Sequence, residues 1–341
     1  MIRPDRPQVI KTILLQSTIN SYMKFTRLFL LSLGFFAGTS ISKAQNEELG
    51  FTGTIWADGV SESGGWYDVN KNDPWNGDVD DLMCYAASAA NLIAWWQNSE
   101  QGKHLTSSAP KDINTIWETY KSSNRVPDIG GDTPSAINWW ISGVYSPTND
   151  AEWSRYYTEQ LKEELPLTFA PFSGYYYNQY GLTNKELSEL IFDACLYGEG
   201  SKDGAAEIDF KSMFESGSCI SLAIMAESTD LAHAITLWGV EYEEGVLTKL
   251  WLTDSDDADI SEDPRLFGAS VTMGDGGKIY ITGTDNDTEE WLYYGSADVY
   301  IDSVYAINSL ASAGWQLVPE PSTATLSLLA LAGLTARRRR K

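Results

Sequence analysis

Cys84 and His233 are the two residues whose types and settings best suit covalent chemistry at neutral pH. The 341-residue chain contains three cysteines and two histidines, so candidate nucleophiles and bases are few. Cys84 opens a predicted helix, whose unpaired N–H groups and positive dipole end stabilise a thiolate. His233 begins an apolar stretch, predicted to be a strand, that would fix its imidazole at a sheet edge. Because an unperturbed thiol is only slightly ionised at neutral pH, an imidazolium partner would turn Cys84 into a nucleophile.

Asp254 is the candidate for a third group that holds the imidazole in one tautomer. It follows a predicted strand that is joined to the strand of His233 by a turn at residues 243–245. An antiparallel hairpin would therefore bring Asp254 level with His233. The surrounding acidic run, residues 253–259, can also be interpreted as a solvated loop or a calcium site, since calcium favours spaced carboxylates. The run lacks the glycine and the terminal glutamate of an EF-hand, and we expect no metal and no cofactor.

The other histidine and the other cysteines have simpler interpretations. His104 lies in a polar loop after a predicted helix, so we expect it to be solvated. Cys195 lies in an apolar helical stretch and Cys219 at the start of a strand, which predicts two buried thiols. In an oxidising compartment these two could instead form a disulfide and leave Cys84 as the reactive cysteine.

The charge of the chain excludes several classes of function. The sequence has 24 basic and 47 acidic side chains, which gives a formal net charge of −23. Non-specific binding to nucleic acid needs clustered Lys and Arg that displace counterions from phosphate, and binding to an anionic membrane surface has a similar need. We therefore expect neither partner, and we expect a substrate that is neutral or cationic.

The N-terminal end has the composition of a targeting segment. From Met23 to Ala44, a basic start, an apolar stretch and small residues before a cleavage site are typical of a secretory signal peptide. This pattern predicts a true start at Met23 and removal of residues 1–44, so that the exported domain spans residues 45–317. A buried N-terminal helix is the alternative.

The C-terminal end, residues 318–341, is a tripartite tail of a Pro-Glu-Pro motif, a short apolar stretch and a basic cluster. The apolar helix would be short for a bilayer, and the basic cluster would stay cytoplasmic. This order resembles the PEP-CTERM sorting signal of Gram-negative bacteria. The resemblance implies that an exosortase-type membrane enzyme cuts near the motif, and that the protein is secreted or held at the cell envelope or outer surface. Contact with the membrane would occur only through the tail. A permanent single-span anchor is the alternative.

The middle of the chain changes from helical to strand patterns after about Ser218. Stretches that favour helices precede this point, at residues 84–97, 112–120, from 133, 150–165 and 184–197. Short apolar stretches between turn signals follow it, at residues 220–226, 234–242, 247–253, 278–282 and 299–307. Helices followed by an antiparallel sheet predict one α+β domain with a helical N-terminal lobe and a β-sheet C-terminal lobe.

Four motifs, in order along the chain, resemble the IdeS/Mac family of immunoglobulin-degrading cysteine endopeptidases. They are Gly65–Lys71, Asp80–Trp96, His233–Gly239 and Leu252–Asp256. The resemblance spans about residues 60–310 and implies a papain-like fold and hydrolysis of peptide bonds through a Cys-His-Asp triad. It implies that Cys84 is the nucleophile, His233 the base and Asp254 the residue that orients it. It further implies that Asp256 supports the site and that Lys71 lies near the oxyanion hole.

Two departures from the family pattern affect these expectations. The segment between Lys71 and Cys84 is longer in this chain, and Tyr85 replaces a small residue at a position expected to border the substrate cleft. We therefore expect a secreted cysteine endopeptidase with a protein substrate, and nothing supports immunoglobulin as that substrate. Two alternatives remain. One is acyl transfer to an amine by the same triad, as in transglutaminase-like enzymes. The other is a non-catalytic surface module that binds proteins through a cleft altered by Tyr85.

Overall fold

The computed structural model describes residues 50–71, 80, 82–123, 126, 128, 130–145, 174–196, 208–227, 232–256, 264–274, 277–284 and 299–318. The chain divides into two units, Met1–Thr52 and Gly53–Lys341, and every helix and strand described below belongs to the second. The predicted signal peptide, the predicted helix at 150–165 and the tail beyond Val318 lie outside the described residues. Within the described part of the chain, no helix has both the length and the apolar character needed to cross a bilayer.

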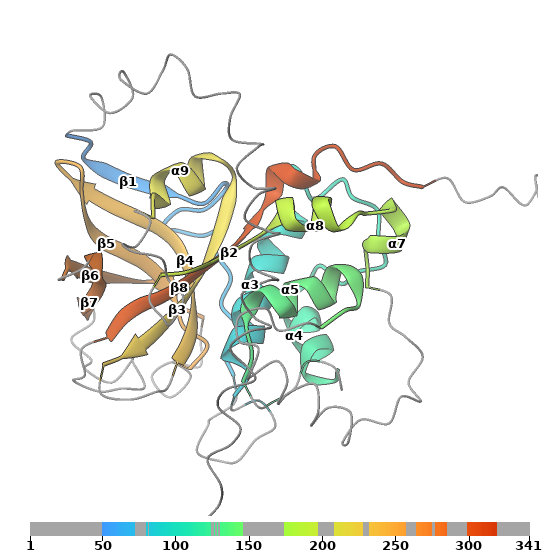
Figure 1. Cartoon of the computed structure of the whole chain (residues 1–341), viewed down its shortest axis with the longest axis horizontal. Helices are drawn as coiled ribbons and strands as arrows, with labels where there is room; N and C mark the ends of the chain where they lie inside the picture. The colour runs from blue at the N-terminus through green and yellow to red at the C-terminus, as the bar shows by residue number, and fades with distance from the viewer. Residues whose placement is uncertain are drawn as a thin grey trace, which may run out of the picture. The chain divides into compact units, whose positions relative to one another are not determined.

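Six antiparallel strands form a closed barrel (Figure 1). They are β3 (Ser218–Ala226), β4 (Ala232–Glu243), β5 (Val246–Thr253), β6 (Phe267–Met273), β7 (Ile279–Thr284) and β8 (Val299–Asn308). Each strand pairs with the next one in sequence, and β8 pairs with β3 to close the circle. Register shifts in the β3–β8, β4–β5 and β6–β7 pairings add the bend and twist that closure requires.

This barrel shows that the predicted fold class is wrong. We expected an α+β, papain-like arrangement of a helical N-terminal lobe and an antiparallel β-sheet C-terminal lobe. The structure instead has a closed barrel that is accompanied by a few helices. Local patterns identify strands, and five of the six barrel strands were predicted to within a few residues. Such patterns do not say which strand edges meet, however, and closure depends on pairing the first barrel strand with the last.

Two further strands lie outside the barrel circle. Strand β1 (Gly53–Trp56) pairs with the later part of β4, and β2 (Ile191–Cys195) pairs with β8. Strand β2 falls within the stretch 184–197, which was predicted to be helical. Helix α8 (Asn184–Leu190) ends before it, because the strand-favouring residues that follow pair with β8. Tertiary pairing therefore overrides the helical pattern at this point.

Helix α3 (Cys84–Asn98) is the central helix of the fold, as the pattern at 84–97 predicted. It contacts β3, β4 and β8 of the barrel as well as the helices α4 (Ile113–Lys121) and α5 (Thr133–Ser142) (Figure 1). Every residue from Tyr85 to Gln97 is buried. A helix that is covered all round needs small and apolar side chains on every face, and the Ala-rich sequence of α3 provides them.

Aspartates begin the two helices beside α3. The Asp112 side chain accepts a hydrogen bond from the N–H of Thr115 at the start of α4. The Asp132 side chain likewise accepts from the N–H of Ser135 at the start of α5, at 2.7 Å. The N-cap of α5 is therefore Asp132, and the helix begins at Thr133. The remaining described helices are short, α7 (Tyr177–Tyr180) and α9 (Phe210–Glu215).

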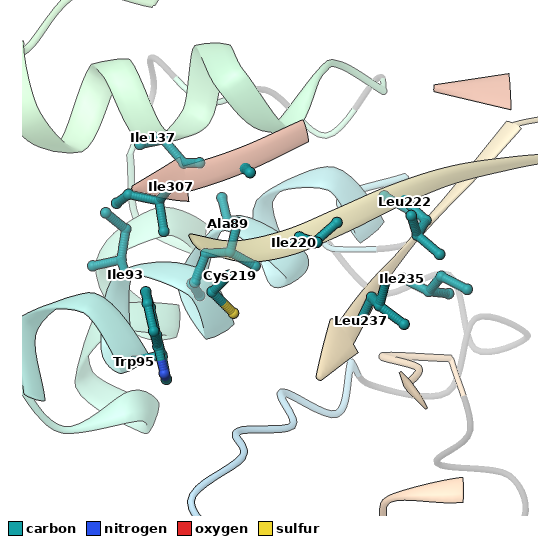
Figure 2. Packing of buried hydrophobic residues seen from close by; sticks show 14 of the residues in the cluster. Ala89, Ile93, Trp95, Ile137, Cys219, Ile220, Leu222, Ile235, Leu237 and Ile307 are labelled. Atoms are coloured by element: carbon teal, nitrogen blue, oxygen red, sulfur yellow. The ribbon is translucent and has the colours of Figure 1, made fainter. Parts of the chain in front are cut away.

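The core joins α3 to the barrel. Figure 2 shows Ala89 and Ile93 of α3 beside Ile220 of β3 and Ile307 of β8, with Ile137 of α5 above them. All five side chains are fully buried. The apolar surface that they remove from water stabilises the contact between the helix and the strands. The N-terminus of α3 is thereby held in a fixed place relative to the barrel.

We predict that Trp96→Ala strongly destabilises the domain. The Trp96 ring is fully buried, packs against Tyr176 and Trp315, and donates its N–H to Ser312 at 3.1 Å. Truncation would leave a large cavity and lower the free energy of unfolding by about 3–5 kcal/mol, as measured by chemical denaturation. Truncation of the exposed Leu310 is the control, with an expected change within about 0.5 kcal/mol. A loss of less than about 1 kcal/mol for Trp96→Ala would contradict the packing described for α3.

Candidate active site

The structure brings the five sequence-predicted site residues together. Cys84 is the first residue of α3, His233 is the second residue of β4, and Asp254 directly follows β5. Lys71 and Asp256 lie in loops that meet at the same place, where the Lys71 Nζ is 2.7 Å from the Asp256 Oδ1. One helix, two neighbouring strands and two loops therefore contribute to one site.

The β4–β5 hairpin places Asp254 beside His233, as the sequence predicted. The register pairs Thr236 with Thr253, which puts the ends of the two strands at one level. The turn that sets this register contains Glu244 and Gly245, both with positive φ. Two consecutive residues of positive φ form a type I′ turn, whose twist suits a two-residue hairpin.

The His233 ring lies between two carboxylates. Its Nε2 is 2.6 Å from the Asp254 Oδ1, and its Nδ1 is 3.5 Å from the Asp256 Oδ2. The same Asp254 oxygen accepts the backbone N–H of Asp256 at 3.0 Å, which fixes the carboxylate. Because Nε2 faces Asp254, Nδ1 is the ring nitrogen left to face the Cys84 thiol. Asp254 is therefore placed to hold both the tautomer and the orientation of the ring.

Burial and the neighbouring charges shift the pKa of His233 in opposite directions. Burial by itself lowers the pKa of the imidazole, but the carboxylates of Asp254 and Asp256 outweigh it, and hydrogen bonds to Asp254 and Cys84 add to their effect. The pKa of His233 therefore lies well above its ordinary value. A raised pKa keeps the imidazole in its charged form up to a higher pH than usual.

The Cys84 thiol is shifted in the complementary direction. Burial by itself raises its pKa, but the hydrogen bond to His233, the imidazolium charge and the Lys71 ammonium together outweigh it. The pKa of Cys84 therefore lies below its ordinary value, so the thiolate persists to a lower pH. Cys84 is half-buried as a residue, the partly exposed setting in which reactive cysteines are found.

Lys71 is a buried ammonium that is paired with Asp256. Burial by itself lowers its pKa, but Asp256 outweighs this effect, with a smaller contribution from a Cys84 thiolate, so the pKa lies above its ordinary value. The backbone N–H of Lys71 also donates to the Ser255 carbonyl at 2.8 Å. Lys71 therefore brings a fixed positive charge close to the Cys84 sulfur. The segment between Lys71 and Cys84, which is longer than in the family pattern, does not prevent this.

The start of α3 has no acidic cap. The N-cap residue is Met83, whose side chain makes no capping hydrogen bond, and its carbonyl oxygen accepts the N–H groups of Ala86 and Ala87 at 2.9 Å each. The sequence places Asp80 and Asp81 just before this helix. Asp80 is fully buried, while Asp81 lies outside the described residues. The positive end of the helix dipole therefore lies at Cys84, with no acidic residue in the first turn of α3.

Tyr85 lies in a different position from the one predicted, and His104 lies outside the site. Tyr85 was expected to border a substrate cleft, but its ring is buried and packs against Tyr145. His104 is exposed, as expected, beyond the far end of α3, a 15-residue helix about 22 Å long.

Cys195 and Cys219 do not form the disulfide considered above. Cys219 is a free, fully buried thiol, and burial raises its pKa well above the ordinary value. Strand β8 lies between the two cysteines, with Ser303 paired to Cys195 and Ile307 paired to Cys219. Their backbones are therefore two strand spacings apart, about 9.5 Å, and four residues apart along the strands. A disulfide requires a shorter Cα separation.

Three potential metal ligands lie close together, but their geometry fits ion pairs better than a cation. Ligand atoms of His233, Asp254 and Asp256 lie within 4.8 Å of one another. The His233 Nε2 already faces the Asp254 Oδ1, and the Lys71 ammonium already faces Asp256. A bound cation would have to compete with both positive partners.

Sequence reasoning missed the polar side chains beneath the site. Ser88 and Asn91 lie four and seven residues after Cys84, which places them on the same face of α3. Both are buried, and both hydrogen-bond to Thr236 of β4. Two polar residues at helical spacing within an otherwise apolar helix were the signal that could have identified them.

We predict that the reaction of Cys84 with iodoacetamide continues well below the pH at which an ordinary thiol, with a pKa of about 8.5, loses its thiolate. His233→Ala removes the imidazolium and should shift the pH profile upward toward that ordinary value. His104→Ala, which alters the only other histidine, should leave the profile unchanged. The measurement is the alkylation rate at the Cys84 peptide, followed by mass spectrometry. Equal profiles for wild type and His233→Ala would contradict the pairing.

Comparison with known proteins gives similarities at both ends of the described domain. Residues 48–124, which contain Lys71 and Cys84, match the Mac 1 family model. Residues 317–341 match the PEP-CTERM protein-sorting motif. This motif indicates export and sorting to the cell envelope or surface in Gram-negative bacteria, with processing by an exosortase.

One curated relative matches a longer part of the chain. The chain is 25% identical over 221 residues to the IgM protease of Streptococcus suis (strain P1/7). The match covers 57% of this chain and 18% of that relative, so the chain corresponds to less than a fifth of the relative's length. The chain therefore carries a segment similar to the Mac 1 family, followed at its C-terminus by a PEP-CTERM sorting motif.

Proposed function

We propose that this protein is an exported cysteine endopeptidase that hydrolyses peptide bonds in a protein substrate. The observation that carries the proposal is the position of the His233 ring, between the Asp254 carboxylate and the Cys84 thiol. The similarity to the Mac 1 family and to a protein named as an IgM protease supports the same reaction class. In this proposal Cys84 is the nucleophile, His233 the acid and base, and Asp254 the residue that orients the imidazole.

In the first half of the proposed reaction the Cys84 thiolate attacks the carbonyl carbon of the scissile peptide bond. A C–S bond forms, and the electron pair of the C=O bond moves onto its oxygen. When the oxygen re-forms its double bond, the C–N bond breaks and the leaving nitrogen takes the proton of the His233 imidazolium. The products are a free amine and a thioester on Cys84, with His233 left neutral.

In the second half His233 acts as a base. It takes a proton from a water molecule as the water oxygen attacks the thioester carbon. Collapse of this second intermediate breaks the C–S bond, releases a carboxylic acid and restores the thiolate–imidazolium pair. Asp254 keeps the ring in place throughout and stabilises its positive charge.

The proposed oxyanion site uses the start of α3 and Lys71. In this proposal the backbone N–H of Cys84, at the start of α3, and the buried Lys71 ammonium are the donors that stabilise developing negative charge. The ion pair with Asp256 holds the Lys71 ammonium in place, so little reorganisation is needed during the reaction. The same positive charge also favours the resting thiolate.

The proposed substrate is a neutral or cationic protein outside the inner membrane. The strongly acidic composition of the chain repels anionic polymers and favours such partners. We also propose that an N-terminal signal peptide directs export and that the protein is released or held at the cell surface after processing of the C-terminal motif. Immunoglobulin is not part of the proposal.

The position of Tyr85 does not support the alternative of a non-catalytic module that binds proteins. A binding cleft altered by Tyr85 requires this side chain at the surface, whereas its ring lies in the core. Acyl transfer to an amine uses the same residues and differs only in the acceptor. It is therefore distinguished by the product.

We predict that Cys84→Ala abolishes turnover, since no other described residue at the site can form the thioester. The measurement is a proteome-wide identification of new N-termini after incubation of envelope proteins with wild type or variant. His104→Ala is the matched control and should generate the same N-termini as wild type. Cleavage that persists in Cys84→Ala and remains sensitive to iodoacetamide would contradict the assignment. Incorporation of a labelled amine in place of new N-termini would instead identify an acyl transferase.

A further inference from the structure

A buried polar cluster lies directly beneath the candidate site, between α3 and the barrel. It consists of Ser88, Asn91, Thr133, Ser221 and Thr236. All five residues are at most 2% exposed. Buried polar groups cost stability unless they are hydrogen-bonded, so the partners of such a cluster are strongly specified.

Asn91 connects three segments of the chain. Its Oδ1 accepts the backbone N–H of Val69 at 3.1 Å, and its Nδ2 donates to the Thr236 Oγ1 at 3.1 Å. One amide therefore joins the segment before Lys71, the helix α3 and the strand β4. An amide can make these two bonds only when all three segments are correctly placed.

Each of these segments carries a site residue close to its bond with Asn91. Val69 precedes Lys71 by two residues, and Thr236 follows His233 by three. Asn91 itself lies two helical turns after Cys84, on the same face of α3. The bonds of Asn91 are therefore made near the residues whose relative positions determine the chemistry.

Ser88 adds a second connection between α3 and β4, one helical turn from Cys84. Its hydroxyl hydrogen-bonds with the Thr236 Oγ1 at 3.0 Å and lies 3.3 Å from the Ile235 carbonyl oxygen. Two side chains of α3, the helix that begins with Cys84, therefore hydrogen-bond to Thr236 of β4. Ser221 and Thr133 extend the cluster toward β3 and α5, which carry no site residue.

Thr253 makes a comparable connection on the other side of the hairpin. Its hydroxyl accepts the Trp238 indole N–H at 3.0 Å and donates to the Tyr67 carbonyl at 3.1 Å. The residue directly before Asp254 is thereby tied to β4 and to the same segment that Asn91 holds. The site is supported by directional bonds from both sides, in addition to apolar packing.

We propose that Asn91 and Thr236 are positioning residues, whose hydrogen bond sets the placement of α3 relative to β4 and thereby of the Cys84 sulfur relative to the His233 ring. This inference rests on the proposed thiolate–imidazolium pair. Apolar contacts alone would hold the helix against the barrel, but they are not directional, so they permit small displacements. Displacement of a reacting group by about 1 Å can lower a rate by about a hundredfold.

The test compares three substitutions in the full-length chain. Thr236→Val removes the hydroxyl while keeping the shape of the side chain, and Thr236→Ser restores the hydroxyl. Ser221→Ala is the matched control, because it removes a buried hydroxyl from the same cluster that contacts Ser88 and Thr133 but not Asn91. The readout is the pH dependence of iodoacetamide alkylation at Cys84, with thermal unfolding measured in parallel.

For Thr236→Val we expect the midpoint of the alkylation profile to rise by about one pH unit, which lowers the alkylation rate about tenfold at pH values below the wild-type midpoint. Thr236→Ser and Ser221→Ala should stay within about twofold of the wild-type rate, although Ser221→Ala should also unfold at a lower temperature. A purely structural role would lower the unfolding temperature of Thr236→Val and of Ser221→Ala without moving either profile.

Two results would overturn the inference. One is a wild-type profile for a folded Thr236→Val, and the other is an equal shift in Ser221→Ala. If Thr236→Val does not fold, Asn91→Ser removes the same bond from α3, together with the bond to Val69, and the same outcomes apply. An ordinary thiol profile in the wild-type protein would instead contradict the proposed function itself, so the two failures are distinguishable.

Discussion

The attraction between the Cys84 sulfur and the charged ring of His233 is the interaction on which the rest of the site depends. Both groups are taken from water, which opposes their ionisation, and each is charged only because the other groups of the site outweigh that cost. Among the effects that oppose burial at the ring, the charge of Asp254 is the largest, while Lys71 adds positive charge at the sulfur. Removal of any one partner would therefore change the charge state of the others, as expected for coupled groups.

The fold brings the Cys84 sulfur and the His233 ring together by placing the N-terminus of α3 at the end of the β4–β5 hairpin. The helix α3 is buried on all sides, so its N-terminus cannot shift without disturbing the core. The type I′ turn joins β4 to β5, and the paired strands bring Asp254 to His233, with the Asp254 Oδ1 2.6 Å from the His233 Nε2. Asn91 and Thr236 join these two parts by a directional bond. Apolar burial supplies most of the stability, and the buried polar bonds supply the alignment.

The candidate site was easier to predict from the sequence than the fold. Cys84, His233 and Asp254 were identified because a helix start, a strand start and a hairpin are local features. The closed barrel was not predicted, because the β3–β8 pairing joins distant segments and leaves no local pattern. The end of α8 and the strand β2 were missed for the same reason. Tyr85 was misplaced because sequence order alone does not say which face of the first helical turn is covered.

The most direct test of this account is the protonation state of the His233 ring, measured by nitrogen-15 NMR. The chain has only two histidines, so the ring signals can be assigned by comparison with His104→Ala. The account predicts that both ring nitrogens of His233 carry protons at pH 7, above the ordinary imidazole pKa of about 6.5. It also predicts that the pH at which the ring loses its proton falls when Cys84 is replaced by alanine. A neutral His233 ring at pH 7 in the wild-type protein would contradict it.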